Sequence, residues 1–308
     1  MLLESQTLQR TETDKSAIRL LAISLRPWEW VKNVFLFSAL FFSANILSPE
    51  MLLKSLLAFG LFCLAAGGVY LVNDIWDRPH DEKHPQKRMR PIASGALSVS
   101  LAAPVAVILH IVAVAGAFLL TPMFGVVTAA YVLLSVAYSK WLKHAVILDV
   151  FSIAAGFVLR VVAGAVVIDV MISHWLLICT MLLALFLGFS KRRCELVALA
   201  DDASLHRRVL NEYDARFLDM MIGIVTSATV VAYTLYTVSQ ETIQKFHTDR
   251  LLLTVPFVLY GIFRYLYLVY HKNNGGAPAY TLMTDRPLLL NVILWGFVCG
   301  LIIYSAKP

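Results

Sequence analysis

Residues 52–81 read LLKSLLAFGLFCLAAGGVYLVNDIWDRPHD and decide the fold. Up to residue 72 the stretch is mainly apolar, with Lys54 as its one charge, and it matches the roughly 20 residues that a helix needs to cross the hydrocarbon core of a bilayer. It then ends in the polar pattern NDxxDxxxD, formed by Asn73, Asp74, Asp77 and Asp81. The stretch therefore predicts a membrane-spanning helix that carries a group of carboxylates at one end.

The composition extends this conclusion to the whole chain. Of its 308 residues, 59% are hydrophobic and 15% are charged, with a mean hydropathy of +0.73. Soluble domains contain roughly 45–50% apolar and about 25% charged residues. These values exclude an ordinary soluble enzyme and a disordered chain. The four cysteines include no CxxC pair, so no disulfide or metal-thiolate framework is predicted.

Nine apolar segments predict an all-α membrane protein with nine transmembrane helices in a single domain, 1–308. The segments are 33–48, 52–73, 99–120, 122–139, 146–168, 172–190, 217–238, 251–271 and 287–305. The first of them is the shortest. Residues 1–20 form a polar N-terminal segment, in which the charges near the start predict no signal peptide.

Lysine and arginine mark the cytoplasmic side of a membrane protein. With a cytoplasmic N-terminus, 20 of the 26 lysines and arginines fall on that side, four fall on the other side, and Arg160 and Arg264 lie within spans. The distribution predicts a cytoplasmic N-terminus and an odd number of spans. On the cytoplasmic side, loops 74–98 and 191–216 are long and rich in acids and bases, so we expect both to cover the catalytic site.

The NDxxDxxxD motif predicts a magnesium site. At about 100° per helical residue, its four polar side chains fall within an arc of about 100° on one helix face. Clustered carboxylates need a cation, and Mg²⁺ prefers oxygen ligands shared with substrate phosphates, so we expect the motif to hold a diphosphate leaving group through Mg²⁺. Pro79 interrupts a regular helix, and Asp81 is therefore expected to reach back from a loop. The alternative is a solvated helix end whose acids pair with nearby arginines.

The segment that follows, 83–95, is basic and rich in turns. Arginine forks match phosphate oxygens. The segment therefore predicts a phosphate-facing lid formed by Lys83, Lys87, Arg88 and Arg90. The alternative for each of these residues is a plain topology signal of the cytoplasmic side.

These features resemble the UbiA superfamily of intramembrane prenyltransferases, through the acidic motif, its place after the second span and the nine spans. Five further segments resemble the decaprenyl-phosphate phosphoribosyltransferase branch of that superfamily, and the resemblance covers about residues 20–305. The segments are RPWEWVKN (26–33), HPQKRMRPIASG (84–95), YSKWLK (138–143), FVLR (157–160) and KRRCEL (191–196).

The resemblance implies a UbiA-like bundle and a Mg-dependent glycosyltransferase in the bacterial inner membrane, with its active site facing the cytoplasm. A polyprenyl phosphate would attack C1 of 5-phosphoribosyl 1-diphosphate (PRPP), giving polyprenylphosphoryl-5-phosphoribose and diphosphate. Aromatic prenyltransferases of the superfamily carry a second acidic motif after span 6, where this chain has Lys191, Arg192 and Glu195. Cations at this place suit the additional 5-phosphate of PRPP.

The expected catalytic residues are Asp74, Asp77, Asp81 and Lys191, and the expected metal ligands are Asn73, Asp74, Asp77 and Asp81. The expected substrate-binding residues are Lys32, Asn33, Lys83, Lys87, Arg88, Arg90, Tyr138, Lys143, Asp149, Arg160, Lys191, Arg192, Glu195 and Tyr213. Asp149 and Arg160 share a face of one span about 16 Å apart, so they do not pair. The alternatives are a structural ion pair between helices for Arg160 and a charge at a helix start for Asp149.

Two other functions compete with this interpretation. A UbiA-type prenyltransferase would use a prenyl diphosphate donor and a small aromatic or other acceptor. A secondary transporter would place its charged site near the bilayer midplane, whereas the acids here lie at the cytoplasmic rim. The expected partners are PRPP, a polyprenyl phosphate and the bilayer, and topology explains the net charge of +6 without nucleic acid. Homo-oligomer formation is left open.

Overall fold

The computed structural model describes residues 17–85, 87–198, 210, 212–272 and 276–306, and this part of the chain contains no strand. Residues 17–24 form a first helix. The following elements, with η for a 3-10 helix, are η1 (Pro27–Phe37), α2 (Ser38–Phe42), α3 (Pro49–Asp81), η2 (Lys87–Met89), α4 (Val99–Leu120), α5 (Pro122–Lys140), η3 (Leu142–His144), α6 (Leu148–Val167), α7 (His174–Ala198), α8 (Ala215–Val238), α9 (Gln240–Phe246), η6 (Arg250–Thr254), α10 (Val255–His271), α11 (Pro278–Thr284) and α12 (Arg286–Ser305). Most of the predicted N-terminal segment and the middle of the predicted loop 191–216 lie outside the described residues.

Eight helical segments in the described chain are long and apolar enough to cross a membrane. They are α3, α4, α5, α6, α7, α8, η6 with α10, and α12, and each overlaps one predicted span from 52–73 onward. Helices pair every backbone polar group within the segment, which the bilayer core requires. The predicted all-α membrane fold is therefore confirmed, while the count of nine spans and the side of the N-terminus stay predictions.

The first predicted span, 33–48, is not one continuous α-helix. Its first part belongs to η1, and α2 adds only five residues before the chain turns. Ala44 adopts a left-handed conformation with φ 57°, and the Asn45 side chain donates to Ser43 Oγ at 3.0 Å. Local bonds of this kind compete with helix propagation, and the chain then reverses into α3, whose first turn is capped by Ser48.

The helix that carries the acidic motif continues past Pro79, so the expectation that Asp81 reaches back from a loop is wrong. α3 ends at Asp81, and Glu82 N still bonds to Arg78 O at 3.0 Å. A proline so close to a helix end removes one backbone donor but leaves little helix beyond it to disturb. Asp81 therefore lies on the same helix as the other acids and is itself buried.

α6 lies between two hydrophobic clusters. One cluster joins it to α7, α8, α10 and α12, and the other joins it to η1, α2, α3, α4 and α5. η1 approaches α6 so closely that a Cβ on Gly164 would lie 1.9 Å from Leu36 O. Only glycine fits at this crossing, and the contact holds η1 inside the bundle.

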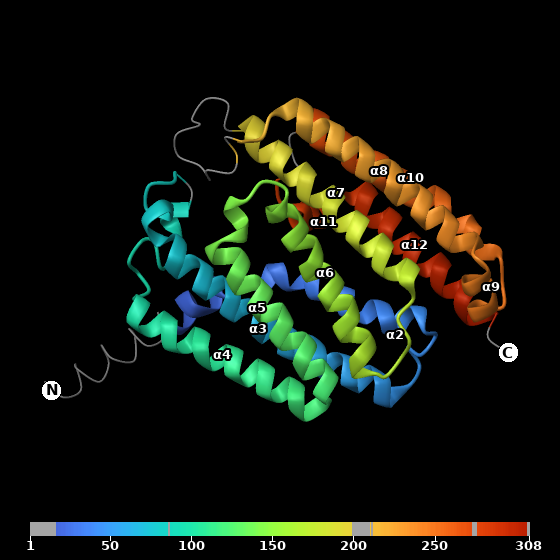
Figure 1. Cartoon of the computed structure of the whole chain (residues 1–308), viewed down its shortest axis with the longest axis horizontal. Coiled ribbons are helices and arrows are strands. Elements are labelled where there is room, and N and C mark those ends of the chain that lie inside the picture. The colour runs from blue at the N-terminus through green and yellow to red at the C-terminus, as the bar shows by residue number, and fades with distance from the viewer. Residues whose placement is uncertain (1–16, 86, 199–209, 211, 273–275, 307–308) are drawn as a thin grey trace, which may run out of the picture.

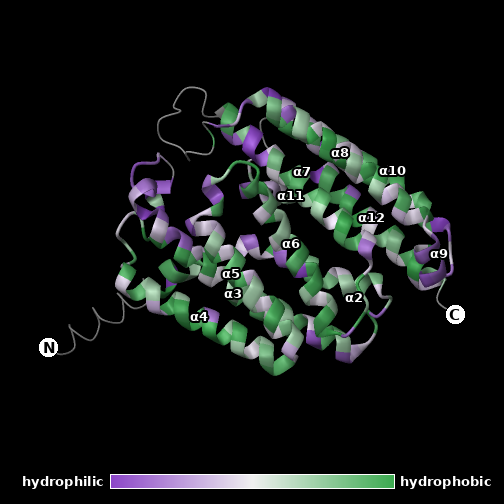
Figure 2. Cartoon of the chain, viewed as in Figure 1, coloured by the Kyte–Doolittle hydropathy of each residue, from purple (hydrophilic) through white to green (hydrophobic). Residues whose placement is uncertain are grey.

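The two ends of the bundle differ in their loops. Figure 1 shows the end of α3, the loop that follows it and the end of α7 at one end, with α9 and the end of α12 at the other. Hydrophilic residues gather at both ends, and the helices between them are mostly hydrophobic (Figure 2). We call the end with Asp74, Asp77 and Asp81 the acidic end.

Candidate functional site

Two arginines cover the acidic motif at the end of α3. Asp74 is only 2% exposed, and its Oδ1 accepts hydrogen bonds from Arg26 at 2.5 Å and from Arg90 at 3.1 Å. Arg90 also donates to Oδ2 of Asp81 at 2.6 Å. One guanidinium therefore joins two carboxylates that lie about two helical turns apart.

The remaining carboxylate of the motif pairs with a lysine from another element. Lys143 of η3 contacts Asp77 Oδ1, and Asn73 donates to Asp77 Oδ2 at 3.0 Å. Lys143 is buried although it is charged. Three cations thus face three aspartates, and the motif is electrically balanced in this arrangement.

The motif offers suitable ligands for Mg²⁺ but does not gather them around one point. Among the described residues, no group of three or more His, Cys, Asp or Glu side chains is placed to hold a metal ion. The arginines use Oδ1 of Asp74 and Oδ2 of Asp81, so the second oxygen of each carboxylate lies outside these contacts. Carboxylate oxygens suit Mg²⁺, and the residues fit this ion once the cations have moved away.

The predicted lid divides into one residue that reaches the motif and three that face outward. Arg90 contacts Asp74 and Asp81, as described above. Lys83 and Arg88 are exposed, and Lys87 is partly exposed.

A second group of predicted residues forms a buried network between α6 and α7. Arg192 is 1% exposed and donates to Asp149 and to Glu195, each at 2.6 Å. It also bonds to the hydroxyl of Tyr138 at 3.2 Å. Tyr213 donates to the second oxygen of Asp149 at 2.8 Å, and burial raises the pKa of Tyr213, which keeps this donor protonated. The guanidinium of Arg192 is therefore committed to protein groups.

Lys191 differs from its neighbour in accessibility. Its side chain is 36% exposed, and its Nζ lies 3.8 Å from Glu195 Oε1. The charge of Lys191 also acts on Glu29 in η1. Lys191 is therefore a residue of α7 whose charge acts on a side chain of η1.

η1 arranges its side chains in columns, because a 3-10 helix has about 3.0 residues per turn and places residues i and i+3 above one another. Asn33 and Leu36 form a buried column, whereas Trp28 and Val34 belong to an exposed one. The third column, which we call the polar column, runs from Arg26 through Glu29 and Lys32 to Phe35. An α-helix would spread these four residues around its axis.

The middle of the polar column is an ion pair. Lys32 Nζ lies 2.5 Å from Glu29 Oε2, and both side chains keep some exposure, 31% and 24%. Burial alone would raise the pKa of Glu29, but Lys32, Lys191 and Arg26 hold it below its usual value. Burial opposes the charge of Lys32, but Tyr70 and Glu29 raise its pKa above its usual value. Both groups are therefore charged at neutral pH.

Arg160 lies deep in the bundle with neutral partners. It is 7% exposed, and it donates to Asn33 Oδ1 at 2.8 Å, to Gly156 O at 2.8 Å and to the Tyr131 hydroxyl at 2.9 Å. Its guanidinium also lies over the rings of Tyr131 and Phe157. Within the described residues, Arg160 has no carboxylate in hydrogen-bond contact, and the structural ion pair that was its sequence-based alternative is not formed there.

The structure therefore brings most of the predicted residues into three groups, whereas Lys83 and Arg88 stay exposed at the surface, and it adds residues that were not expected. Arg26 and Glu29 stand in the RPWEWVKN segment but were not among the expected site residues. Their spacing of three from one another and from Lys32 was the available signal, since it matches the period of a 3-10 helix. Tyr131 gave no sequence signal, because it reads as one more aromatic residue in an apolar span.

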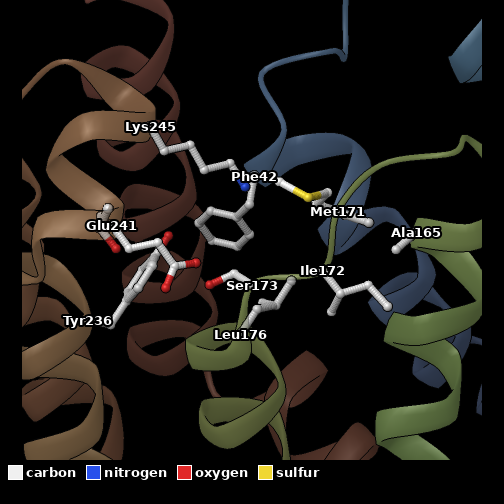
Figure 3. A pocket seen from close by; sticks show the side chains of 11 residues that line it. Phe42, Ala165, Met171, Ile172, Ser173, Leu176, Tyr236, Glu241 and Lys245 are labelled. Atoms are coloured by element: carbon white, nitrogen blue, oxygen red, sulfur yellow. The ribbon is translucent and has the colours of Figure 1, made fainter.

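A pocket at the opposite end contains none of the predicted site residues. Its lining includes Phe42 of α2, Tyr236 of α8, and Glu241 and Lys245 of α9. Figure 3 shows Phe42 between these side chains and the segment that carries Ile172. We place the candidate site at the acidic end, because the clustered charges described above lie there.

Comparison with known proteins shows related sequences and folds. The UbiA prenyltransferase family model matches residues 33–284. The decaprenyl-phosphate phosphoribosyltransferase of Mycobacterium tuberculosis strain H37Rv is 32% identical over 276 residues, 88% of this chain and 90% of that protein. The protein of the same name from Corynebacterium glutamicum is 31% identical, over 91% of this chain and 86% of its own length. A solved UbiA homolog from Archaeoglobus fulgidus, bound to GPP and Mg²⁺, has a TM-score of 0.70 at 17% identity and covers 93% of this chain and 99% of its own, a likeness of fold.

Proposed function

The chain belongs to the UbiA prenyltransferase family, and from this premise we propose that it transfers 5-phosphoribose from PRPP to a polyprenyl phosphate of the decaprenyl type. The relatives named decaprenyl-phosphate phosphoribosyltransferase support this choice within the family. The observation that carries it is the last part of α7. There, Lys191 and Arg192 stand in place of a second acidic motif, and the partly exposed Lys191 is placed to bind a donor with an extra phosphate.

The proposed metal site forms by an exchange of partners. Asp74, Asp77 and Asp81 would hold Mg²⁺, which supplies positive charge to the leaving diphosphate. Arg26 and Arg90, now on the carboxylates, would turn to diphosphate oxygens, with Lys143 doing the same from the other side. The exchange keeps every charge compensated. It also explains why the aspartates are paired with cations and not gathered around one point.

The reaction itself needs no general base, because the phosphate of the lipid is already an anion. One of its oxygens forms a bond to C1 of the ribose while the bond from C1 to the diphosphate oxygen breaks, and the electron pair leaves with diphosphate. Direct displacement inverts the anomeric carbon from α to β. The cations around the leaving group stabilise the charge that develops on it.

The orientation of the site follows from the charge distribution. We place the acidic end on the cytoplasmic side of a bacterial inner membrane, because 20 of the 26 lysines and arginines fall on the side of the N-terminus in the predicted topology. PRPP then reaches the site from the cytosol, and the lipid reaches it from the bilayer.

The test is a transfer assay with purified protein. Radiolabelled PRPP, Mg²⁺ and a series of polyprenyl phosphates should give a labelled lipid, whereas EDTA or Asp74→Ala should abolish the product. Glu50→Gln is the matched control, because Glu50 forms an exposed ion pair with Lys54 away from the acidic end. Product formation from a prenyl diphosphate and a small aromatic acceptor, with none from PRPP, would overturn the proposal in favour of a prenyltransferase.

A further inference from the structure

The starting observation is a buried positive charge without a carboxylate partner. Within the described chain, the Arg160 guanidinium bonds to an amide oxygen, a backbone carbonyl and a hydroxyl. A buried charge is costly unless it is paired, and an intramembrane ionisable residue commonly marks a functional site. The neutral partners orient the guanidinium but leave its charge unbalanced.

Lys32 lies beside this charge on the polar column. The charges of Arg160 and Glu29 both act on Lys32, and those of Lys191 and Arg26 act on Glu29. Arg26 and Lys191 contact carboxylates of their own, Asp74 and Glu195, so Glu29 is the carboxylate that compensates Lys32. Because Glu29 and Lys32 balance one another, Arg160 gives the region between them and α6 a positive excess.

The depth of this region separates it from the acidic motif. Arg26 contacts Asp74 of α3, whereas Asn33, next to Lys32, donates to Cys63 of the same helix at 3.3 Å. Eleven residues of α-helix correspond to about 16 Å. Arg160, which bonds to Asn33, is thus well below the acidic end. The charge of Lys32 acts on Tyr70, one helical turn before Asp74, so Lys32 lies between Arg160 and the acidic motif.

The polar column changes character below Lys32. Its next member is Phe35, whose ring packs edge-on against Phe157 at 5.1 Å between centroids. Phe157 also lies against the Arg160 guanidinium. A cationic group directly followed by aromatic rings matches a molecule with an anionic head and a hydrocarbon tail.

From these contacts we infer that Lys32 and Arg160 form the subsite for the phosphate of the lipid acceptor, separate from the donor subsite at Asp74, Asp77 and Asp81. The inference rests on the proposed function for the identity of the lipid, a polyprenyl phosphate. Lys32 binds the phosphate directly, and Arg160 adds positive charge from below. Phe35 and Phe157 receive the first part of the tail.

The test measures binding without turnover. Radiolabelled polyprenyl phosphate is bound to purified protein in EDTA without PRPP, and unlabelled polyprenol with the same tail is the competitor that lacks the phosphate. We expect the phosphate to bind more tightly than the alcohol. Lys32→Gln should raise the Kd for the phosphate about tenfold or more, because a charge-assisted hydrogen bond is lost. The Kd for polyprenol should stay unchanged.

Lys32 is partly exposed, so Lys32→Gln is expected to fold, and Lys32→Arg should retain most of the binding. Lys54→Gln is the matched control, because Lys54 also pairs with a nearby glutamate of its own helix, Glu50, away from the site. A loss of polyprenol and phosphate binding by the same factor would overturn the subsite, since the effect would then concern the tail. The subsite would also be overturned if Lys32→Gln lowered the affinity for PRPP in Mg²⁺ and left the binding of the lipid phosphate unchanged.

The subsite and the proposed function fail in different ways. Charge-dependent lipid binding through Lys32, without transfer from PRPP, would support the subsite and overturn the proposed function. Transfer from PRPP with an unchanged lipid Kd in Lys32→Gln would overturn the subsite alone.

Discussion

Replacing Arg192 by methionine should destabilise the protein more than it weakens PRPP binding. Asp149 is fully buried, and Arg192 is its cationic partner at 2.6 Å. Met removes the charge but keeps much of the volume, so Asp149 is left as a buried carboxylate with the Tyr213 hydroxyl as its remaining side-chain donor. Breaking one side of a buried pair costs roughly 3–5 kcal/mol. At roughly 2–4 °C per kcal/mol, the melting temperature should fall by about 6–20 °C.

The melting temperature can be followed with a dye that reacts with thiols. Cys63, Cys194 and Cys299 are buried thiols that form no disulfide, so they become reactive on unfolding. The double variant Asp149→Asn with Arg192→Met removes both charges, while the asparagine keeps an acceptor for the Tyr213 hydroxyl. We expect it to recover most of the lost stability.

Kinetics decide between a structural and a donor-binding role for Arg192. With Arg192→Met, the KM values for PRPP and for the lipid should both stay within about twofold, and kcat should follow the folded fraction. Lys191→Gln should show the opposite pattern, with a near-normal melting temperature and a PRPP KM raised about tenfold. An unchanged melting temperature in Arg192→Met, with a raised PRPP KM, would refute the structural reasoning and restore Arg192 as a donor ligand.

Three further results are expected. Asp81→Ala should abolish transfer as completely as alanine at the other motif aspartates, because Asp81 lies on α3 and shares its arginine with the motif; substantial residual turnover would place it outside the site. In a background without native cysteines, an impermeant thiol reagent should label Met171→Cys in intact cells and Met89→Cys only after permeabilisation, since both positions are exposed; the reverse pattern would invert the topology. Gly164→Ala should lower the melting temperature and weaken lipid binding by displacing η1, whereas Gly223→Ala, with open space around it, should be neutral or slightly stabilising.

The membrane spans could be predicted from hydropathy, because the bilayer requires long apolar helices. The segment 33–48 shows where this reasoning fails. Hydropathy measures how apolar a segment is, and it does not distinguish a continuous α-helix from a 3-10 helix followed by a turn. The spacing of three between Arg26, Glu29 and Lys32 matches the period of a 3-10 helix. It can be interpreted in this way only when the segment is already known to be a 3-10 helix.

The acidic motif could also be predicted, since its four residues lie within one short stretch of helix. Its cations could not be assigned, because Arg26 directly precedes η1 and Lys143 lies in η3, both far from the motif in sequence. The same limit applies to Asp149 and Arg192. Each was expected to bind substrate, and only the packing of α6 against α7 shows that they bond to one another.

The arginines of this chain differ in how their charge is compensated, and this difference separates their roles. Arg192 is held by the fully buried Asp149, and removing either charge would leave the other stranded, so the pair stabilises the fold. The side chains of Arg26 and Arg90 both contact carboxylates, and they are 18% and 25% exposed. Solvent and a phosphate ligand can therefore compete with the carboxylates for these guanidinium groups. Among the described residues, the hydrogen-bond partners of Arg160 are all neutral. Because a buried guanidinium gains most from an anion when none is already bound to it, Arg160 is the cation whose energy should change most when the lipid phosphate arrives.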